Sequence, residues 1–232
     1  MKFNVWNREL YFDIETKEIT YNSKKFIPSI RTFWDMKNLY KSVWEDYKRE
    51  DVGLYFMYRD VFFNDDDKKI LKNNNIRYDI TIILPDILWW ELNKTYWHYH
   101  PKNSKWKDFE ELYQVLKGEA IYLQQNKKEV FYTNAKQWDS VNMDESFWHI
   151  TINPSKDNLL IMANLVDDTF SSIYNDYSTN KGWNYCFFEK WWEINSNYNN
   201  SLELAESNKK FPVEISIYDD FLTNPEKFNY LH

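Results

Sequence analysis

The chain has 232 residues and a formal net charge of −7, a size that fits one domain with added segments. Nucleic-acid binding needs clustered Lys and Arg side chains, and because this acidic chain shows no such cluster we expect no nucleic-acid partner. No apolar run approaches the roughly 18 residues of a membrane span, and the first residues lack a signal-peptide pattern, so we expect no membrane contact and a cytoplasmic location. The single cysteine, Cys186, is expected to be a small buried apolar residue.

The N-terminal region divides into two patterns. The first thirty residues contain short alternating pieces such as 9–14, which are typical of an arm or an edge hairpin. From 31 to 48, apolar residues that include Phe33, Met36 and Tyr40 recur at helical spacing and predict one amphipathic helix. Residues 1–50 are therefore predicted to form an arm and a helix that pack on the rest of the chain.

A strand-rich region follows Gly53. Many short strands with polar turns and no intervening helices indicate a mainly β fold, a sandwich or a barrel. We expect a barrel over 51–194, a polar loop at 64–75, and an irregular or partly helical C-terminal extension over 195–232. Segment 183–194 satisfies both the strand and the helix period. The predicted strands are 54–58, 61–63, 78–84, 88–92, 95–100, 111–116, 120–125, 129–133, 137–141, 147–153 and 159–166.

Three of the four histidines fall within the stretch 98–149. In an extended segment alternate side chains share a face, so His98 and His100 are aimed at one point. Glu111 on a neighbouring strand adds an oxygen, and His149 adds a third nitrogen. Glu110 is the alternative carboxylate, but the alternation that aligns Glu111 with Tyr113 favours Glu111. Three imidazoles and one carboxylate suit a divalent ion such as iron, manganese, zinc or nickel.

With these residues the chain resembles the cupin-type glucose-6-phosphate isomerase family over roughly residues 10–190. The metal motif is common to many cupins. The frame of Thr81, Pro85 and Thr95, and the ending at 149–153, are more specific to this family. The matching positions are 12–16, Arg31, 35–36, 54–58, 81–85, Thr95, His98, His100, 111–113, 116–118, 123–124, 149–153, 176–177 and 181–183.

The resemblance implies a jelly-roll barrel, a homodimer, and a metal-dependent isomerase that interconverts glucose 6-phosphate and fructose 6-phosphate or a related sugar phosphate. The ion would act as a Lewis acid on the sugar oxygens, and Glu111 is the leading base if a proton moves between C1 and C2. The implied metal ligands are His98, His100, Glu111 and His149, and the implied substrate-binding residues are Thr81, Thr95 and Tyr55. Lys94, next to Thr95, is a further candidate that would add a cation to the substrate site, and a solvated surface lysine is the alternative interpretation.

The chain departs from the family pattern at three places. Trp97 stands where the family has a glycine, Leu165 stands where it has a tyrosine, and the loop 101–110 is longer. Trp97 and Leu165, together with the high aromatic content, motivate a second hypothesis, a non-catalytic carbohydrate-binding or sugar-phosphate-binding cupin that has lost isomerase activity. Cupin dioxygenase chemistry at the same metal is a third hypothesis.

Overall fold

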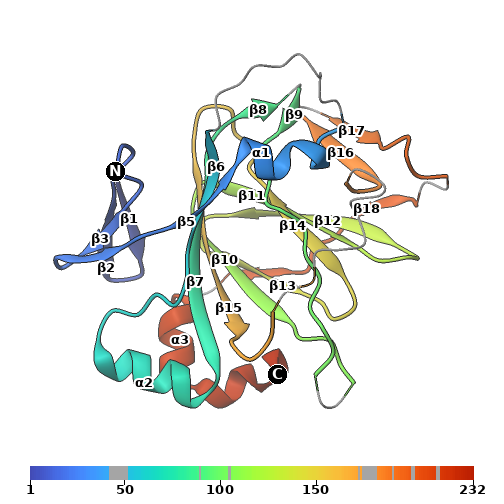
Figure 1. Cartoon of the computed structure of the whole chain (residues 1–232). Helices are drawn as coiled ribbons and strands as arrows, with labels where there is room; N and C mark the ends of the chain where they lie inside the picture. The colour runs from blue at the N-terminus through green and yellow to red at the C-terminus, as the bar shows by residue number, and fades with distance from the viewer. Residues whose placement is uncertain are drawn as a thin grey trace.

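The computed structural model describes residues 1–41, 52–88, 90–103, 106–171, 173, 182–189, 191–199, 202–212 and 215–232. Its centre is a barrel made of two sheets (Figure 1). The large sheet has the order β19-β13-β10-β15-β7-β6-β5, and the smaller sheet has the order β14-β11-β12-β18. The large sheet contains β5 (Ser29–Thr32), β6 (Gly53–Tyr58), β7 (Ile76–Ile83), β10 (Glu111–Lys117), β13 (Asp139–Met143), β15 (Leu160–Asp167) and β19 (Lys210–Pro212), and the smaller contains β11 (Glu119–Gln125), β12 (Val130–Lys136), β14 (Trp148–Ile152) and β18 (Leu204–Glu206).

Further elements surround this barrel. A third sheet, of order β17-β16-β9-β8, lies in the upper part of Figure 1, and the N-terminal sheet β1-β2-β3-β4 stands at one side. Helices α2 and α3 contact each other below the barrel in that view. These elements are β1 (Lys2–Val5), β2 (Arg8–Phe12), β3 (Ile19–Tyr21), β4 (Lys24–Phe26), β8 (Ile87–Leu88), β9 (Glu91–Leu92), β16 (Tyr185–Phe188), β17 (Trp191–Ile194), α1 (Phe33–Met36), η1 (Lys37–Leu39), α2 (Asp65–Asn73), α3 (Ile217–Thr223) and η3 (Pro225–Leu231).

The predicted mainly β cupin jelly roll is confirmed, and the large sheet explains its apolar sequence. Every residue of β15 is buried, because both faces of the sheet are covered. Met162 faces the core between the two sheets, whereas Ile161, Ala163 and Leu165 belong to a second core that also includes residues of β2 and α3. A strand covered on both faces reads as a continuous apolar run. None of the helices in the described ranges is long and apolar enough to cross a membrane.

The predicted single helix over 31–48 is wrong in its extent, because within its described part only α1 and η1 are helical. Arg31 and Thr32 end β5, and only the single turn α1 and the short η1 follow. Asp35 accepts from the backbone N–H of Thr32 at 2.9 Å and starts the turn, but Tyr40 is already extended at φ −97° and ψ 143°. Apolar spacing over a few residues cannot distinguish a helix from a short turn. Residues 42–48 lie outside the described residues.

The predicted loop at 64–75 is also wrong, since it contains α2. The Asn64 side chain caps this helix by accepting from the backbone N–H groups of Asp66 and Asp67 at 3.0 and 2.9 Å. Three aspartates in the first turn add favourable charge at the helix N-terminus. The helix signal was present in the sequence as an N-cap followed by acidic residues.

Four other segments differ from the structure that the sequence predicts or settle an alternative that it left open. Residues 61–63 form no strand, and 95–100 is an extended segment with isolated bridges at His98 and Tyr99. Segment 183–194 folds as two paired strands, β16 and β17. The C-terminal extension supplies two short strands in addition to α3 and η3.

Candidate metal centre

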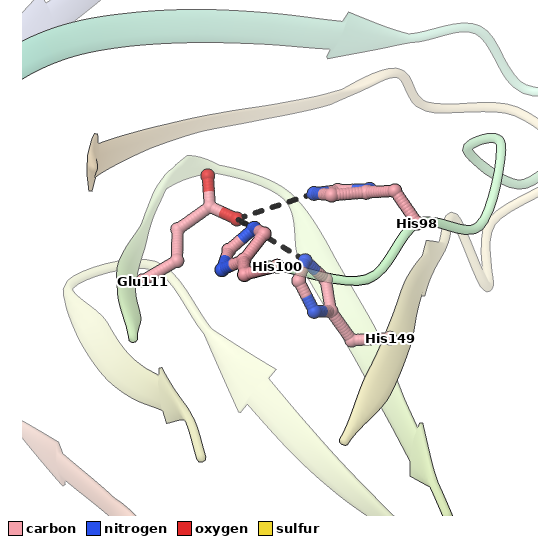
Figure 2. A group of neighbouring side chains, drawn as sticks. All are labelled: His98, His100, Glu111 and His149. Atoms are coloured by element: carbon pink, nitrogen blue, oxygen red, sulfur yellow. Dashed lines mark hydrogen bonds and ion pairs between the residues drawn. The ribbon is translucent and has the colours of Figure 1, made fainter. Parts of the chain in front are cut away.

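Four side chains converge at one end of the barrel. His98 and His100 lie on the extended segment after β9, Glu111 begins β10, and His149 lies in β14. The bridge between His98 and His149 brings the extended segment beside β14, and Figure 2 shows the three imidazoles turned toward the carboxylate. Their candidate ligand atoms all lie within 4.8 Å of one another. The structure thus brings together all four residues that the sequence predicts as metal ligands.

One carboxylate oxygen is the meeting point of the cluster. Oε2 of Glu111 lies 3.1 Å from Nε2 of His149, 3.3 Å from Nε2 of His100 and 3.5 Å from Nε2 of His98. Glu111, His100 and His149 are buried. Three imidazole nitrogens and a carboxylate that face one small volume fit a first-row divalent ion.

The ring of His100 is oriented for this role. Its Nδ1 lies 2.9 Å from the carbonyl oxygen of Phe109, which can only accept a hydrogen bond. The ring proton is therefore on Nδ1, and the lone pair on Nε2 faces the cluster, as in most metal-binding histidines. Nε2 of His100 is buried without a hydrogen-bond partner among the described residues, which supports a ligand role for it.

The environment sets the charge of the cluster. Burial, followed by the neighbouring His98, lowers the pKa of His149 to about 3, so this imidazole stays neutral near neutral pH. Burial by itself raises the pKa of Glu111, but the contacts with His100, His149 and His98 outweigh it and hold the pKa well below its ordinary value. Neutral imidazoles and an ionised carboxylate are the protonation states that bind a metal.

Asn164 holds the second oxygen of Glu111. Its Nδ2 donates to Oε1 at 2.5 Å, so the two oxygens face different partners. Asn164 pairs with Tyr113 across β15 and β10, and burial and the Glu111 carboxylate raise the pKa of the Tyr113 hydroxyl well above 10. Sequence reasoning missed Asn164, although an asparagine within an apolar run was a signal.

A cavity of about 250 Å³ opens beside the cluster. Thr81, Thr95 and Tyr55, the predicted substrate-binding residues other than Lys94, all line it. Oγ1 of Thr95 accepts from the backbone N–H of Thr151 at 3.0 Å, and the hydroxyl of Tyr55 accepts from the backbone N–H of Tyr96 at 3.0 Å. A hydroxyl that accepts can also donate, so Thr95 keeps its own hydrogen to donate.

Lys94 lies elsewhere. It is buried and ion-paired with Glu91, its ammonium is 4.7 Å from the centre of the Tyr40 ring, and it does not line the cavity. The extended segment turns its side chain toward the third sheet, whereas Thr95 beside it reaches the cavity.

Trp97 and Leu165, the two residues that differ from the family pattern, do not line the cavity either. Trp97 is buried in the core between the sheets, and Leu165 packs in the outer core. Because side chains alternate along β15, the inward positions on either side of Leu165 are Asn164 and Val166, which line the cavity.

Charged residues that the sequence did not single out as site residues also line the cavity: Arg31, Arg59, Arg77, Asp79 and Asp167. The available signal was the alternation of Arg77, Asp79 and Thr81 on one face of β7.

A barrel of two mainly antiparallel sheets with three histidines and a glutamate at one end defines a cupin with a candidate metal site. The profile of the family described as glucose-6-phosphate isomerase matches residues 30–203, well over half of the chain. The chain therefore belongs to the cupin-type glucose-6-phosphate isomerase family. Of the positions quoted for the resemblance, 176–177 and 181 lie outside the described residues.

Solved structures give only distant similarities. Vicilin from Capsicum annuum is 16% identical with a TM-score of 0.38, over 51% of this chain and 29% of vicilin. Oxalate decarboxylase from Bacillus subtilis is 12% identical with a TM-score of 0.38, over 52% of this chain and 28% of that enzyme. The chain thus spans less than a third of the length of either protein. A search of curated protein sequences finds no match.

Proposed function

We propose that the protein is a metal-dependent aldose–ketose isomerase that interconverts glucose 6-phosphate and fructose 6-phosphate or a related sugar phosphate. The observation that carries the proposal is the cluster of His98, His100, Glu111 and His149, of which all but His149 line the cavity, in a chain of this family. A cytoplasmic homodimer remains a prediction from the sequence and the family resemblance.

The four residues would hold a divalent ion of iron, manganese, zinc or nickel. When bound, such an ion supplies Lewis acidity to the carbonyl and hydroxyl oxygens of a sugar. Neutral His149 and ionised Glu111 keep the cluster ready to bind a cation. The hydroxyls of Thr81, Thr95 and Tyr55 line the same cavity and are proposed to bind the phosphorylated sugar.

Glu111 is also proposed as the base. Aldose-to-ketose conversion removes a proton from C2 and returns a proton to C1, while a hydroxyl proton moves from O2 to O1. Oε2 of Glu111 faces the histidines, and Oε1 accepts from Asn164. A carboxylate oxygen has two lone pairs, so Asn164 can orient Oε1 and leave one lone pair to carry the proton. This division of the two oxygens lets one residue serve as ligand and base.

A coupled isomerase assay on metal-analysed protein tests the proposal. Protein loaded with iron, manganese, zinc or nickel should interconvert the two hexose phosphates, and the His149→Ala variant should not. Absence of turnover with each of these ions, for hexose and pentose phosphates alike, would contradict the isomerase. Sugar-phosphate binding without turnover would favour the non-catalytic cupin, and oxygen consumption by the iron-loaded protein would favour a dioxygenase.

A further inference from the structure

A phosphorylated substrate brings negative charge into the cavity, and the wall beside β7 carries cations. Arg59 and Arg77 line the cavity together with Glu111, although the chain as a whole has a net charge of −7. The buried ion pair of Lys94 with Glu91 is outside the cavity lining. Arginine is well suited to phosphate because its planar guanidinium donates two parallel hydrogen bonds.

Strand register places these cations relative to the metal cluster. Glu111 pairs with Val166 on β15, and Val166 pairs with Arg77 on β7. Two strand spacings make about 10 Å between the backbones of Glu111 and Arg77. Arg59 directly follows β6, whose last residue Tyr58 pairs with Ile80 of β7. An open-chain six-carbon sugar phosphate, met by the long side chain of Arg59, can bridge this span.

Arg77 and Arg59 differ in the partners of their guanidinium groups. Nε of Arg77 donates to both oxygens of Asp79 at 2.9 Å, and its Nη1 donates to Asp168 at 2.9 Å. Arg59 makes no ion pair within the described parts of the chain, and its Nη2 lies 3.9 Å from the sulfur of Met57. Arg77 is thereby held in place by carboxylates. The charge of Arg59 also acts on Asp79, but within the described parts of the chain no carboxylate is bound to its guanidinium.

We infer that Arg59, with Arg77 held beside it, is the specificity-determining residue for the anionic group of the substrate. The inference rests on the proposed function for the identity of the ligand, a sugar phosphate whose carbonyl end faces the metal cluster. The phosphate lies at the β6–β7 wall, where Thr81, on the same face of β7 as Arg77 and Asp79, adds a hydroxyl. A neutral sugar of the same length lacks this contact.

Calorimetry on the metal-loaded full chain tests the inference. The probes are glucitol 6-phosphate, which cannot isomerise, and inorganic phosphate. Loss of one charge-assisted contact predicts about 10- to 100-fold weaker binding of both probes to Arg59→Ala, with part of the affinity kept in Arg59→Lys. Lys69→Ala is the matched control, because it removes an exposed cation of α2 outside the cavity lining and should bind as the wild type does.

Metal content and far-UV circular dichroism verify that each variant is loaded and folded, and Arg59→Gln replaces Arg59→Ala if the latter fails to fold. Wild-type affinity of the folded Arg59 variants for both probes would overturn the inference. Turnover in the coupled assay with unchanged KM in Arg59→Gln would also overturn it while leaving the isomerase intact. Conversely, Arg59-dependent phosphate binding without any turnover supports the inference and contradicts the isomerase.

Discussion

Replacement of Glu111 by glutamine tests the metal centre with almost no change in side-chain shape. In the wild type, Oε2 faces three imidazole nitrogens at 3.1 to 3.5 Å, and Oε1 accepts from Nδ2 of Asn164. A glutamine has only one side-chain oxygen, so it cannot both offer an oxygen to the metal position and accept from Asn164. If its carbonyl oxygen faces Asn164, its NH₂ group faces the metal position. If it is flipped, two NH₂ groups face each other. Glu111→Gln should therefore bind metal poorly.

The size of the effect follows from linkage. Partners in the outer shell of metal sites are worth about 10- to 100-fold in affinity, so loss of a direct carboxylate ligand should cost at least about 100-fold. An ion at about 100 times its Kd stabilises the folded wild type by about 2.7 kcal/mol, and at about one Kd it stabilises the variant by only about 0.4 kcal/mol. For a chain of this size these values correspond to metal-induced shifts in Tm of about 5–11 °C and about 1–2 °C.

Thermal denaturation with and without a chelator measures both shifts. Glu110→Gln is the matched control, because Glu110 precedes Glu111 but contacts the side chain of Asn142 instead of the histidines. Its metal-induced shift should equal that of the wild type. If Glu111→Gln keeps the full wild-type shift, the cluster does not bind metal through this carboxylate and the reasoning is refuted.

Three further predictions follow from single contacts. Asn164→Leu frees Oε1 of Glu111 and should weaken metal binding by about 10- to 100-fold in calorimetry; unchanged affinity would contradict the orienting role. Leu165→Ala should lower the free energy of unfolding by about 2–5 kcal/mol in urea titrations because Leu165 is fully buried in the outer core, and it should leave metal affinity unchanged; a loss of metal would place Leu165 at the site. Burial, opposed by Arg77, raises the pKa of Asp79 to about 6, above its unfolded value of about 3.9, so its stabilisation is present below about pH 4 and is lost as pH rises through 6. The free energy of unfolding of the wild type minus that of Asp79→Asn, measured by urea titration, should therefore fall by up to about 3 kcal/mol from pH 4 to 7. A difference that is independent of pH would argue against a raised pKa of Asp79.

The sequence by itself determined the main chemistry of the centre. The spacing of His98 and His100 places both rings on one side of an extended segment, and the alternation at Glu111 and Tyr113 selects Glu111 over Glu110. These are local rules, because successive side chains in an extended chain point to opposite faces, whatever the rest of the fold is. The strands of the barrel are predictable for the same reason, as the agreement at β10, β11 and β15 shows.

Only the tertiary structure decided which other residues reach the cavity. The registers between β10, β15, β7 and β6 bring Asn164, Arg59 and Arg77 to the wall that contains Glu111, and they turn Leu165 to the other face. The sequence does not fix these registers locally, since pairing between strands far apart in the chain depends on the whole sheet. The buried pair of Lys94 and Glu91 likewise depends on how the segment after β9 packs. The alternation of side chains within one segment therefore identifies candidate metal ligands, whereas the register between strands identifies the residues that contact them.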